Sequence, residues 1–205
     1  MTVRTPEVTG ARPTLVFLPG SLCDERLFSH QIGALSQSFP TEFIDFSGLA
    51  AIEAMAARVL DSVTGPMIPI GLSMGGIVAA ELIKQDPERI AAAVLLDTNL
   101  GPAGPEQLAT RRRWANQSRA GQFADVVQEM IPLLTTDVET AGELAAEMAL
   151  DAGAAQFLRE NEALINRGHD RRPNLQYLQR PLLLVVGEQD EVCPPSLHRE
   201  MAESA

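Results

Sequence analysis

The chain has 205 residues, of which 45% are hydrophobic and 21% are charged, a balance typical of a globular protein with an ample core. Its formal net charge of −11 argues against nucleic acid or an anionic membrane surface as the main partner. The stretch from Met1 to Pro13 has no apolar segment typical of a secretory signal, and no apolar run approaches the ~20 residues that span a membrane. Two cysteines, Cys23 and Cys193, are too few for a disulfide scaffold, so we expect a cytoplasmic protein.

Short apolar runs alternate with helical patterns through the first hundred residues, and each run ends at a turn signal or a polar residue. This alternation predicts an α/β fold with a doubly wound, mostly parallel sheet that is covered on both faces. Ligands of such sheets bind outside the carboxyl ends of the strands. Strands are predicted over 14–18, 42–46, 67–70 and 91–96, and helices over 24–37, 50–63 and 77–85.

The pattern changes after Leu100. A Gly- and Pro-rich connection over 101–105 precedes a region from Glu106 to about Gly168 that reads as helix throughout, in about four segments. Inserted over the carboxyl edge of the sheet, these helices would form a lid. The triplet Arg111, Arg112 and Arg113 within them is expected to be a solvated helix face.

The sheet resumes near the end of the chain. Pro181 to Val186 is predicted to be the fifth strand, and Ser196 to Ser204 a helix. We therefore expect three parts, namely an N-terminal part of the α/β core over 1–100, a helical lid insertion over 101–175, and an incomplete C-terminal part of the core over 176–205.

One motif points to catalysis. The residues Gly71-Leu72-Ser73-Met74-Gly75 lie between a predicted strand and a predicted helix, and Gly-x-Ser-x-Gly in that setting is a nucleophile elbow. The turn is so tight that its flanking positions, Gly71 and Gly75, must lack side chains. It forces the serine into a strained backbone conformation and leaves its hydroxyl exposed above a helix N-terminus. Ser73 is therefore the candidate nucleophile.

A serine nucleophile also needs N–H donors for the developing oxyanion. The amide of Met74, directly after the serine, points into the helix N-terminus. A second donor should come from the loop after the first strand, where Gly20 allows the backbone to approach closely. We favour the amide of Ser21, with that of Leu22 as the alternative.

An acidic residue is needed to orient the general base. Asp190 follows the fifth strand and comes after the serine in the chain, as the order Ser…Asp of this arrangement requires. Asp97 also ends a strand and is the rival candidate. Glu188 and Glu191 lie close by and are expected to be solvated.

With these residues in place, the sequence resembles the α/β-hydrolase superfamily, in particular its small capped esterase-like members. The resemblance implies that Ser73 is the nucleophile, Asp190 the acid, and the amides of Ser21 and Met74 the oxyanion hole. It implies hydrolysis of a small carboxylic ester through an acyl-Ser73 intermediate, with thioesterase or C–C bond hydrolase activity as alternatives on the same scaffold. The matching segments are 15–20, 71–76, 87–90, 95–98 and 186–190.

The sequence departs from this family in its histidines. The catalytic histidine of the family lies beyond the helix that follows the acid, whereas here the chain ends at Ala205. His30 and His169 precede Asp190, and His198 lies within the final predicted helix, so none occupies the expected position. We therefore expect a hydrolase truncated before its last strand and helix and crippled in catalysis, or a non-catalytic fragment.

Two further expectations concern partners. A sheet that ends at the fifth strand would expose an apolar edge through which the chain could associate. The sequence contains no metal-ligand spacing, phosphate loop or dinucleotide motif, so we expect no metal and no cofactor, and a small-molecule ester as partner rather than nucleic acid or membrane. Thiol chemistry at Cys23 and Cys193 is a weak alternative, because it rests only on their position in loops at the sheet edge.

Overall fold

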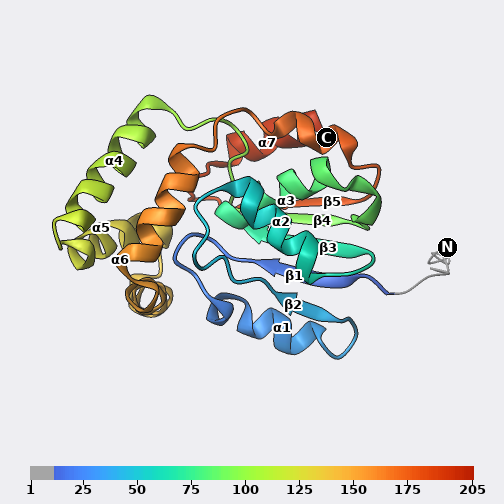
Figure 1. Cartoon of the computed structure of the whole chain (residues 1–205), viewed down its shortest axis with the longest axis horizontal. Helices are drawn as coiled ribbons and strands as arrows, with labels where there is room; N and C mark the ends of the chain where they lie inside the picture. Colours follow the sequence, from blue (N-terminus) through green and yellow to red (C-terminus); the bar gives the residue numbers. More distant parts are fainter. Residues whose placement is uncertain (1–11) are drawn as a thin grey trace.

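A computed structural model describes residues 12–205. Residues 1–11, which make up most of the N-terminal stretch in which no secretory signal is predicted, lie outside the described part. One five-stranded sheet runs through the molecule in the order β2-β1-β3-β4-β5, and every strand pair is parallel. The predicted doubly wound α/β fold is therefore confirmed (Figure 1). The strands are β1 Thr14–Leu18, β2 Thr41–Phe43, β3 Met67–Leu72, β4 Ala93–Leu96 and β5 Leu182–Val185.

Both faces of the sheet carry helices, because alternate strand residues point to opposite sides. Val16 and Leu18 lie in the core formed with α2, α3 and α7, whereas Leu15 and Phe17 pack on the other face with the residues of α1. Within the helix predicted over 24–37, a 3₁₀ turn with Asp24 as its N-cap leads into α1. These elements are η1 Glu25–Phe28, α1 Ser29–Leu35, α2 Ile52–Ser62, α3 Met74–Gln85, η2 Pro87–Arg89, η4 Arg172–Tyr177 and α7 Pro195–Ser204.

A separate group of helices follows β4. They are α4 Pro105–Arg119, α5 Phe123–Leu134, the π-helical turn η3 Val138–Gly142 and α6 Glu143–Ile165, which we call the inserted helices. In Figure 1 they lie on the left, beyond the carboxyl ends of the strands. Their apolar side chains form a second core around Trp114, Phe123 and Phe157. The division into a core and a lid, with boundaries at 100 and 175, stays a prediction.

The second predicted strand is wrong in its C-terminal half. β2 covers Thr41–Phe43 rather than 42–46, because the backbone beyond it makes other hydrogen bonds. The guanidinium of Arg58 donates to the carbonyls of Asp45 and Ser47, and the Asp45 carboxylate accepts the Ser47 amide at 2.8 Å. The apolar residues that suggested a longer strand pack into the core from a loop.

The strand β5 forms one edge of the sheet, as expected. Its side chains alternate, so that Leu182 and Leu184 pack against the main core while Leu183 and Val185 stay 55% and 43% exposed. An apolar strip therefore lies open along this edge. Association of the chain through it stays a prediction. Within residues 12–205, no helix combines the length and the apolar character needed to cross a membrane.

Candidate active site

The elbow has the geometry that its sequence predicts. Ser73 joins β3 to α3 with φ 50° and ψ −110°, and its amide donates to the carbonyl of Leu96 on the neighbouring strand at 2.9 Å. A Cβ atom added to Gly75 would lie 2.1 Å from the carbonyl oxygen of Leu18, and one added to Gly71 would lie 2.3 Å from the carbonyl oxygen of Gly75. Only glycine fits at either position, so the two flanks of the serine are fixed by contact with backbone.

Backbone strain gathers at the same edge of the sheet. Within residues 12–205, the non-glycine residues with positive φ are Leu22, Ser73 and Asp97, at 62°, 50° and 41°. They follow β1, β3 and β4, three adjacent strands, at their carboxyl ends. Such conformations cost about 1–3 kcal/mol each and collect at functional sites. The strain therefore marks the edge where the sequence predicted the site.

Two backbone amides are free to serve as oxyanion donors. Those of Ser21 and Met74 donate to no group within residues 12–205, whereas the amide of Leu22 donates to Oε2 of Glu160 at 2.7 Å. Of the two alternatives in this loop, the available donor is therefore Ser21. Its role in an oxyanion hole stays a proposal.

Glu160, on α6, is a contributor to the site that sequence reasoning missed. Its buried carboxylate accepts hydrogen bonds from Oγ of Ser21 at 2.8 Å, from the amide of Leu22, and from Nε2 of Gln156 at 2.8 Å. Burial raises the pKa of this carboxyl, and the three donors oppose that shift. The inserted helices thus hold the loop that carries the proposed oxyanion donor, through contacts between residues about 140 positions apart in the chain.

We expect Glu160→Ala to destabilise the protein by about 2 kcal/mol, because the buried Leu22 amide and the Gln156 amide both lose their acceptor. Glu160→Gln keeps one acceptor oxygen and should cost less than the alanine variant. Urea unfolding measures both, with Glu162→Ala, an exposed position on the same helix, as the matched control. A Glu160→Ala protein as stable as the control would contradict this role.

Asp190 and Asp97 both lie at the site, and both are held by backbone. The Oδ1 atom of Asp190 accepts the amides of Val192 and Cys193 at 2.8 and 2.7 Å, which folds the loop around the carboxylate. The Oδ1 atom of Asp97 accepts the amide of Gly187 at 2.8 Å, so this residue ties the end of β4 to the loop after β5. The second interaction gives Asp97 a structural role in this connection. The assignment of Asp190 as the acid stays a proposal.

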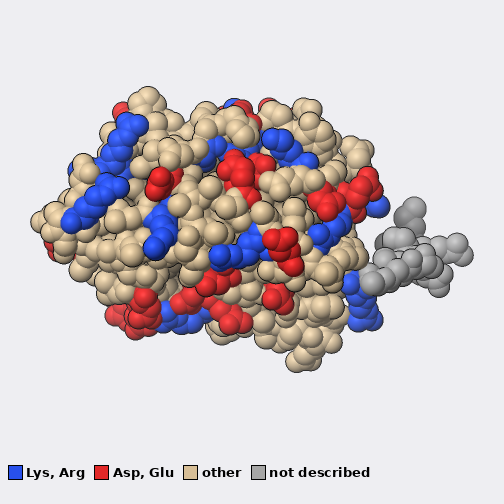
Figure 2. Space-filling view, viewed as in Figure 1, with Lys and Arg blue, Asp and Glu red and all other residues tan. Residues whose placement is uncertain are grey.

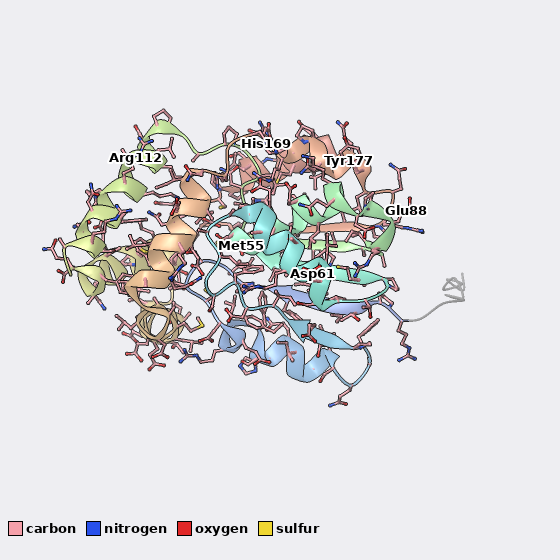
Figure 3. The ribbon with its side chains drawn as sticks, viewed as in Figure 1. Met55, Asp61, Glu88, Arg112, His169 and Tyr177 are labelled. Atoms are coloured by element: carbon pink, nitrogen blue, oxygen red, sulfur yellow. The ribbon has the colours of Figure 1, made fainter. Side chains whose placement is uncertain are left out.

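The described histidines do not reach the nucleophile. The hydroxyl of Ser73 makes no hydrogen bond to any group of residues 12–205. His198 is buried on α7, where its Nε2 accepts the amide of Thr98 at 3.4 Å and burial lowers its pKa. His30 and His169 are exposed, and Figure 3 shows His169 on the connection that follows α6. None of the three imidazoles contacts the hydroxyl as a base must, and the absence of a general base stays a prediction.

The two thiols are poor nucleophiles. Burial, followed by the charges of Glu160 and Asp24, raises the pKa of Cys23 to about 12. Burial also raises the pKa of Cys193 to about 12, with Asp190 as the next cause. A thiol in such surroundings holds almost no thiolate near neutral pH, which argues against the thiol alternative. Among the described residues, no three or more His, Cys, Asp and Glu side chains group closely enough to hold a metal ion.

A small apolar cavity of about 20 Å³ lies beside the proposed oxyanion loop. The residues Ser21, Leu22 and Cys23 form one side, and apolar side chains of α5 and α6, among them Val127 and Ala149, form the other. A space of this size holds a group comparable to one water or one methyl. The inserted helices therefore pack closely against the Ser21 loop on this side.

The arginine triplet of α4 corrects one expectation. Arg112 and Arg113 are exposed, and Figure 2 shows basic side chains along this part of α4. Arg113 pairs with Glu129 and lies 5.9 Å from the centre of the Trp114 ring. Arg111, in contrast, turns inward and its Nε atom is buried, so the three do not form one solvated face.

Comparison with known proteins decides the family. A family model described as serine aminopeptidase, S33, matches residues 45–205, which is most of the chain. The chain belongs to this α/β-hydrolase family. Membership makes it an enzyme of the hydrolase class, as predicted, and the matched range includes Ser73, Asp97 and Asp190.

Two curated relatives of this S33-family chain are esterases by name. It is 26% identical over 210 residues to the pimeloyl-[acyl-carrier protein] methyl ester esterase of Nitrosomonas europaea, with 92% of the chain and 81% of the relative covered. It is 29% identical over 160 residues to the esterase of the same name from Klebsiella pneumoniae, with 72% of the chain covered. The chain spans 60% of the length of this second relative.

Solved structures agree with the family. A thermophilic esterase from Thermogutta terrifontis, with malate bound, is 27% identical at a TM-score of 0.82 and covers 96% of this chain and 79% of its own. The enol-lactonase from Burkholderia xenovorans shares the fold at a TM-score of 0.81 and 22% identity, over 97% of this chain and 81% of its own.

Proposed function

We propose that this S33-family hydrolase acts on a small carboxylic ester and that Ser73 is its nucleophile. The observation that carries the proposal is the elbow, in which a strained serine at the end of β3 stands at the N-terminus of α3 between two glycines that admit no Cβ. Close backbone contacts maintain this strain, and strained backbone collects at functional sites, which supports a catalytic role.

In the proposed reaction, Oγ of Ser73 attacks the ester carbonyl carbon and its proton passes to a general base. The carbonyl oxygen becomes an oxyanion that accepts the amides of Ser21 and Met74. The bond to the alcohol oxygen then breaks, the alcohol leaves with the proton, and acyl-Ser73 remains. Water hydrolyses this acyl-serine and releases the carboxylic acid. Asp190 is proposed to orient that base. Within residues 12–205, no side chain forms a hydrogen bond with the Ser73 hydroxyl.

The relatives support an ester as substrate. Two curated esterases and a solved esterase match most of this chain, and the Thermogutta enzyme was solved with malate, a dicarboxylate, bound. The cavity beside Ser21 supports a small group on that side of the ester carbonyl. Thioesterase and C–C bond hydrolase activities use the same nucleophile, and nothing in the described site favours either of them over ester hydrolysis.

A fluorophosphonate probe tests the nucleophile directly, because an activated serine oxygen displaces its fluoride and retains the phosphonyl group. We expect the folded protein to be labelled on the peptide that contains Ser73. Ser73→Ala should abolish the labelling completely, while Ser36→Ala, at an exposed serine after α1, should leave it unchanged. Heat-unfolded protein should not be labelled.

Two outcomes would count against the proposal. Labelling that persists in Ser73→Ala would place the reactive serine elsewhere. Absence of labelling in the folded protein would favour a non-catalytic fold, the competing interpretation of this chain.

A further inference from the structure

Two arginines lie between α4 and the end of α6 without an acidic partner, Arg167 buried and Arg111 half-buried. Arg111 donates from Nη1 to the side-chain oxygen of Asn161 at 3.2 Å, and Arg167, only 5% exposed, donates from Nη2 to the side-chain oxygen of Gln107 at 3.3 Å. The Nε atom of each is buried and has no hydrogen-bond partner within residues 12–205. Both guanidinium groups are thus satisfied in part, by neutral amides alone.

This arrangement differs from that of the other interior arginine. Arg171 is fully buried and forms ion pairs with Glu53 and Glu81. Within residues 12–205, no carboxylate lies within ion-pair distance of Arg111 or Arg167. A buried charge without a counter-charge is costly, and buried charges in proteins are normally paired or bound to a metal ion, so an unpaired one calls for a partner.

The two charges also act on each other. Burial, with the nearby charge of Arg167 as the second cause, lowers the pKa of Arg111 to about 10. Burial also lowers the pKa of Arg167, with the charge of Cys193 opposing the shift and that of Arg171 adding to it. Both groups still carry a proton near neutral pH, so two like charges lie close together beneath the inserted helices, one buried and one half-buried.

Their surroundings place them at the proposed active site. Cys193 lies close enough to both arginines for their charges to act on its thiol, and the amide of the same residue donates to the Asp190 carboxylate at 2.7 Å. On the other side, Asn161 accepts from Arg111 and directly follows Glu160, which holds the Ser21 loop. The pair is therefore bounded by the loop of the proposed acid and by the support of the proposed oxyanion loop.

The nearby carboxylates do not neutralise the pair. Asp190 and Asp97 each use Oδ1 to accept backbone amides, and neither forms an ion pair with Arg111 or Arg167. The free donors that remain are guanidinium N–H groups, which match the planar, two-oxygen geometry of a carboxylate.

We propose that Arg111 and Arg167 bind an ionised carboxylate of the substrate, so that the preferred ester is a monoester of a dicarboxylic acid. The inference rests on the proposed function and names the substrate class of that same site. The carboxylate would supply the counter-charge that the pair lacks and would orient the ester group toward Ser73. In a chain of net charge −11, a local positive pair also offsets the general repulsion of an anionic substrate.

Binding can be measured without turnover in a Ser73→Ala background. Monomethyl esters of four- to seven-carbon dicarboxylic acids are compared with the matching dimethyl esters by isothermal titration calorimetry. We expect at least one monoester to bind about tenfold or more tightly than its diester, a preference that weakens as salt is raised. Arg167→Gln and Arg111→Gln should each abolish the preference. Arg112→Gln, which removes an exposed arginine from the same helix (Figure 3), should keep it.

Folding of the variants is checked by thermal unfolding without ligand. Removal of an unpaired buried charge should leave the unfolding temperature equal to or above that of the parent. Inorganic phosphate is added as a competing anion. If the monoester preference persists at millimolar phosphate, the two arginines select a carboxylate rather than any anion.

The inference would be overturned if monoester and diester bound equally, or if Arg112→Gln lost the preference for the monoester. It would also be overturned if both Arg167→Gln and Arg111→Gln kept that preference. The proposed function fails separately, because the neutral fluorophosphonate does not need the arginines. Ser73 labelling without a monoester preference would contradict only the proposed carboxylate site. A monoester preference without labelling would contradict only the proposal that Ser73 is the nucleophile.

Discussion

Gly75→Ala should destabilise the protein by about 3 kcal/mol and lower fluorophosphonate labelling of Ser73 more than tenfold. The added Cβ would lie 2.1 Å from the carbonyl oxygen of Leu18 and 2.8 Å from that of Pro19, and both are backbone atoms that cannot turn away. Relief requires β1 and the start of α3 to separate, which displaces Ser73 from its position at the helix N-terminus. Urea unfolding and the labelling rate measure the two effects.

The matched control is Gly33→Ala. Gly33 lies within α1, and a Cβ there meets nothing within 4 Å. The alanine should stabilise the helix by about 0.5–1 kcal/mol, because glycine loses more backbone entropy on folding. A Gly75→Ala protein that unfolds within 1 kcal/mol of wild type, with labelling unchanged, would show that the elbow tolerates a side chain.

Arg171→Met should cost about 3–5 kcal/mol, since it leaves the buried carboxylate of Glu81 without its charged partner. Arg171 donates from Nε to Oε2 of Glu81 at 3.0 Å, and it also bonds Glu53 of α2 and the carbonyl of Arg167. One side chain thus fastens the end of the inserted helices to two helices of the main core. Arg172→Met is the control, because Arg172 pairs with Asp170 and Glu200 at the surface and should contribute less than about 1 kcal/mol.

A double variant separates the loss of the ion pair from the loss of packing. Arg171→Met combined with Glu81→Met removes both charges, so stability should recover most of the way toward wild type. A double variant as unstable as Arg171→Met alone would mean that the arginine acts through contacts other than its charge.

The same pair sets a pH dependence. Burial acts to raise the pKa of Glu81, but hydrogen bonds from Gln85 and Arg171 hold it below its usual value. A carboxyl with a lowered pKa contributes stability that is present above its unfolded pKa and is lost as the pH falls through the folded value. Wild type should therefore lose stability below a pH of about 4.5. Arg171→Met should lose less over the same range, as urea unfolding at each pH will show.

Sequence reasoning found the parts of this molecule that local patterns determine. A short apolar run such as the one in β3, Met67–Leu72, is typical of a buried strand. The glycines on either side of Ser73 are required by the tight turn of a nucleophile elbow. These features gave the sheet, the elbow and the order of candidate residues along its edge. The family match over residues 45–205 agrees with that result.

The same reasoning could not find contacts that depend on tertiary structure. Glu160 reads as one acidic residue among many on a helix, and only the folded chain brings it to Ser21 and Leu22. Arg111 stands in a run of three arginines whose exposure differs because α4 turns 100° per residue, which points one of them inward. A helical pattern that placed Trp114 and Arg111 on one inward face would have been the available signal, since positions three apart share a face.

Leu22 belongs to two structures at once. Its side chain is buried among the apolar residues of the inserted helices, while its backbone, at φ 62°, forms the loop that presents the Ser21 amide. These helices therefore cannot swing outward as one body unless Leu22 leaves its pocket and both bonds to Glu160 break. Wide opening of these helices and the present conformation of the Ser21 loop are therefore mutually exclusive states. Under the proposed function, a substrate would have to enter by a narrower route or wait for the loop to re-form before acylation.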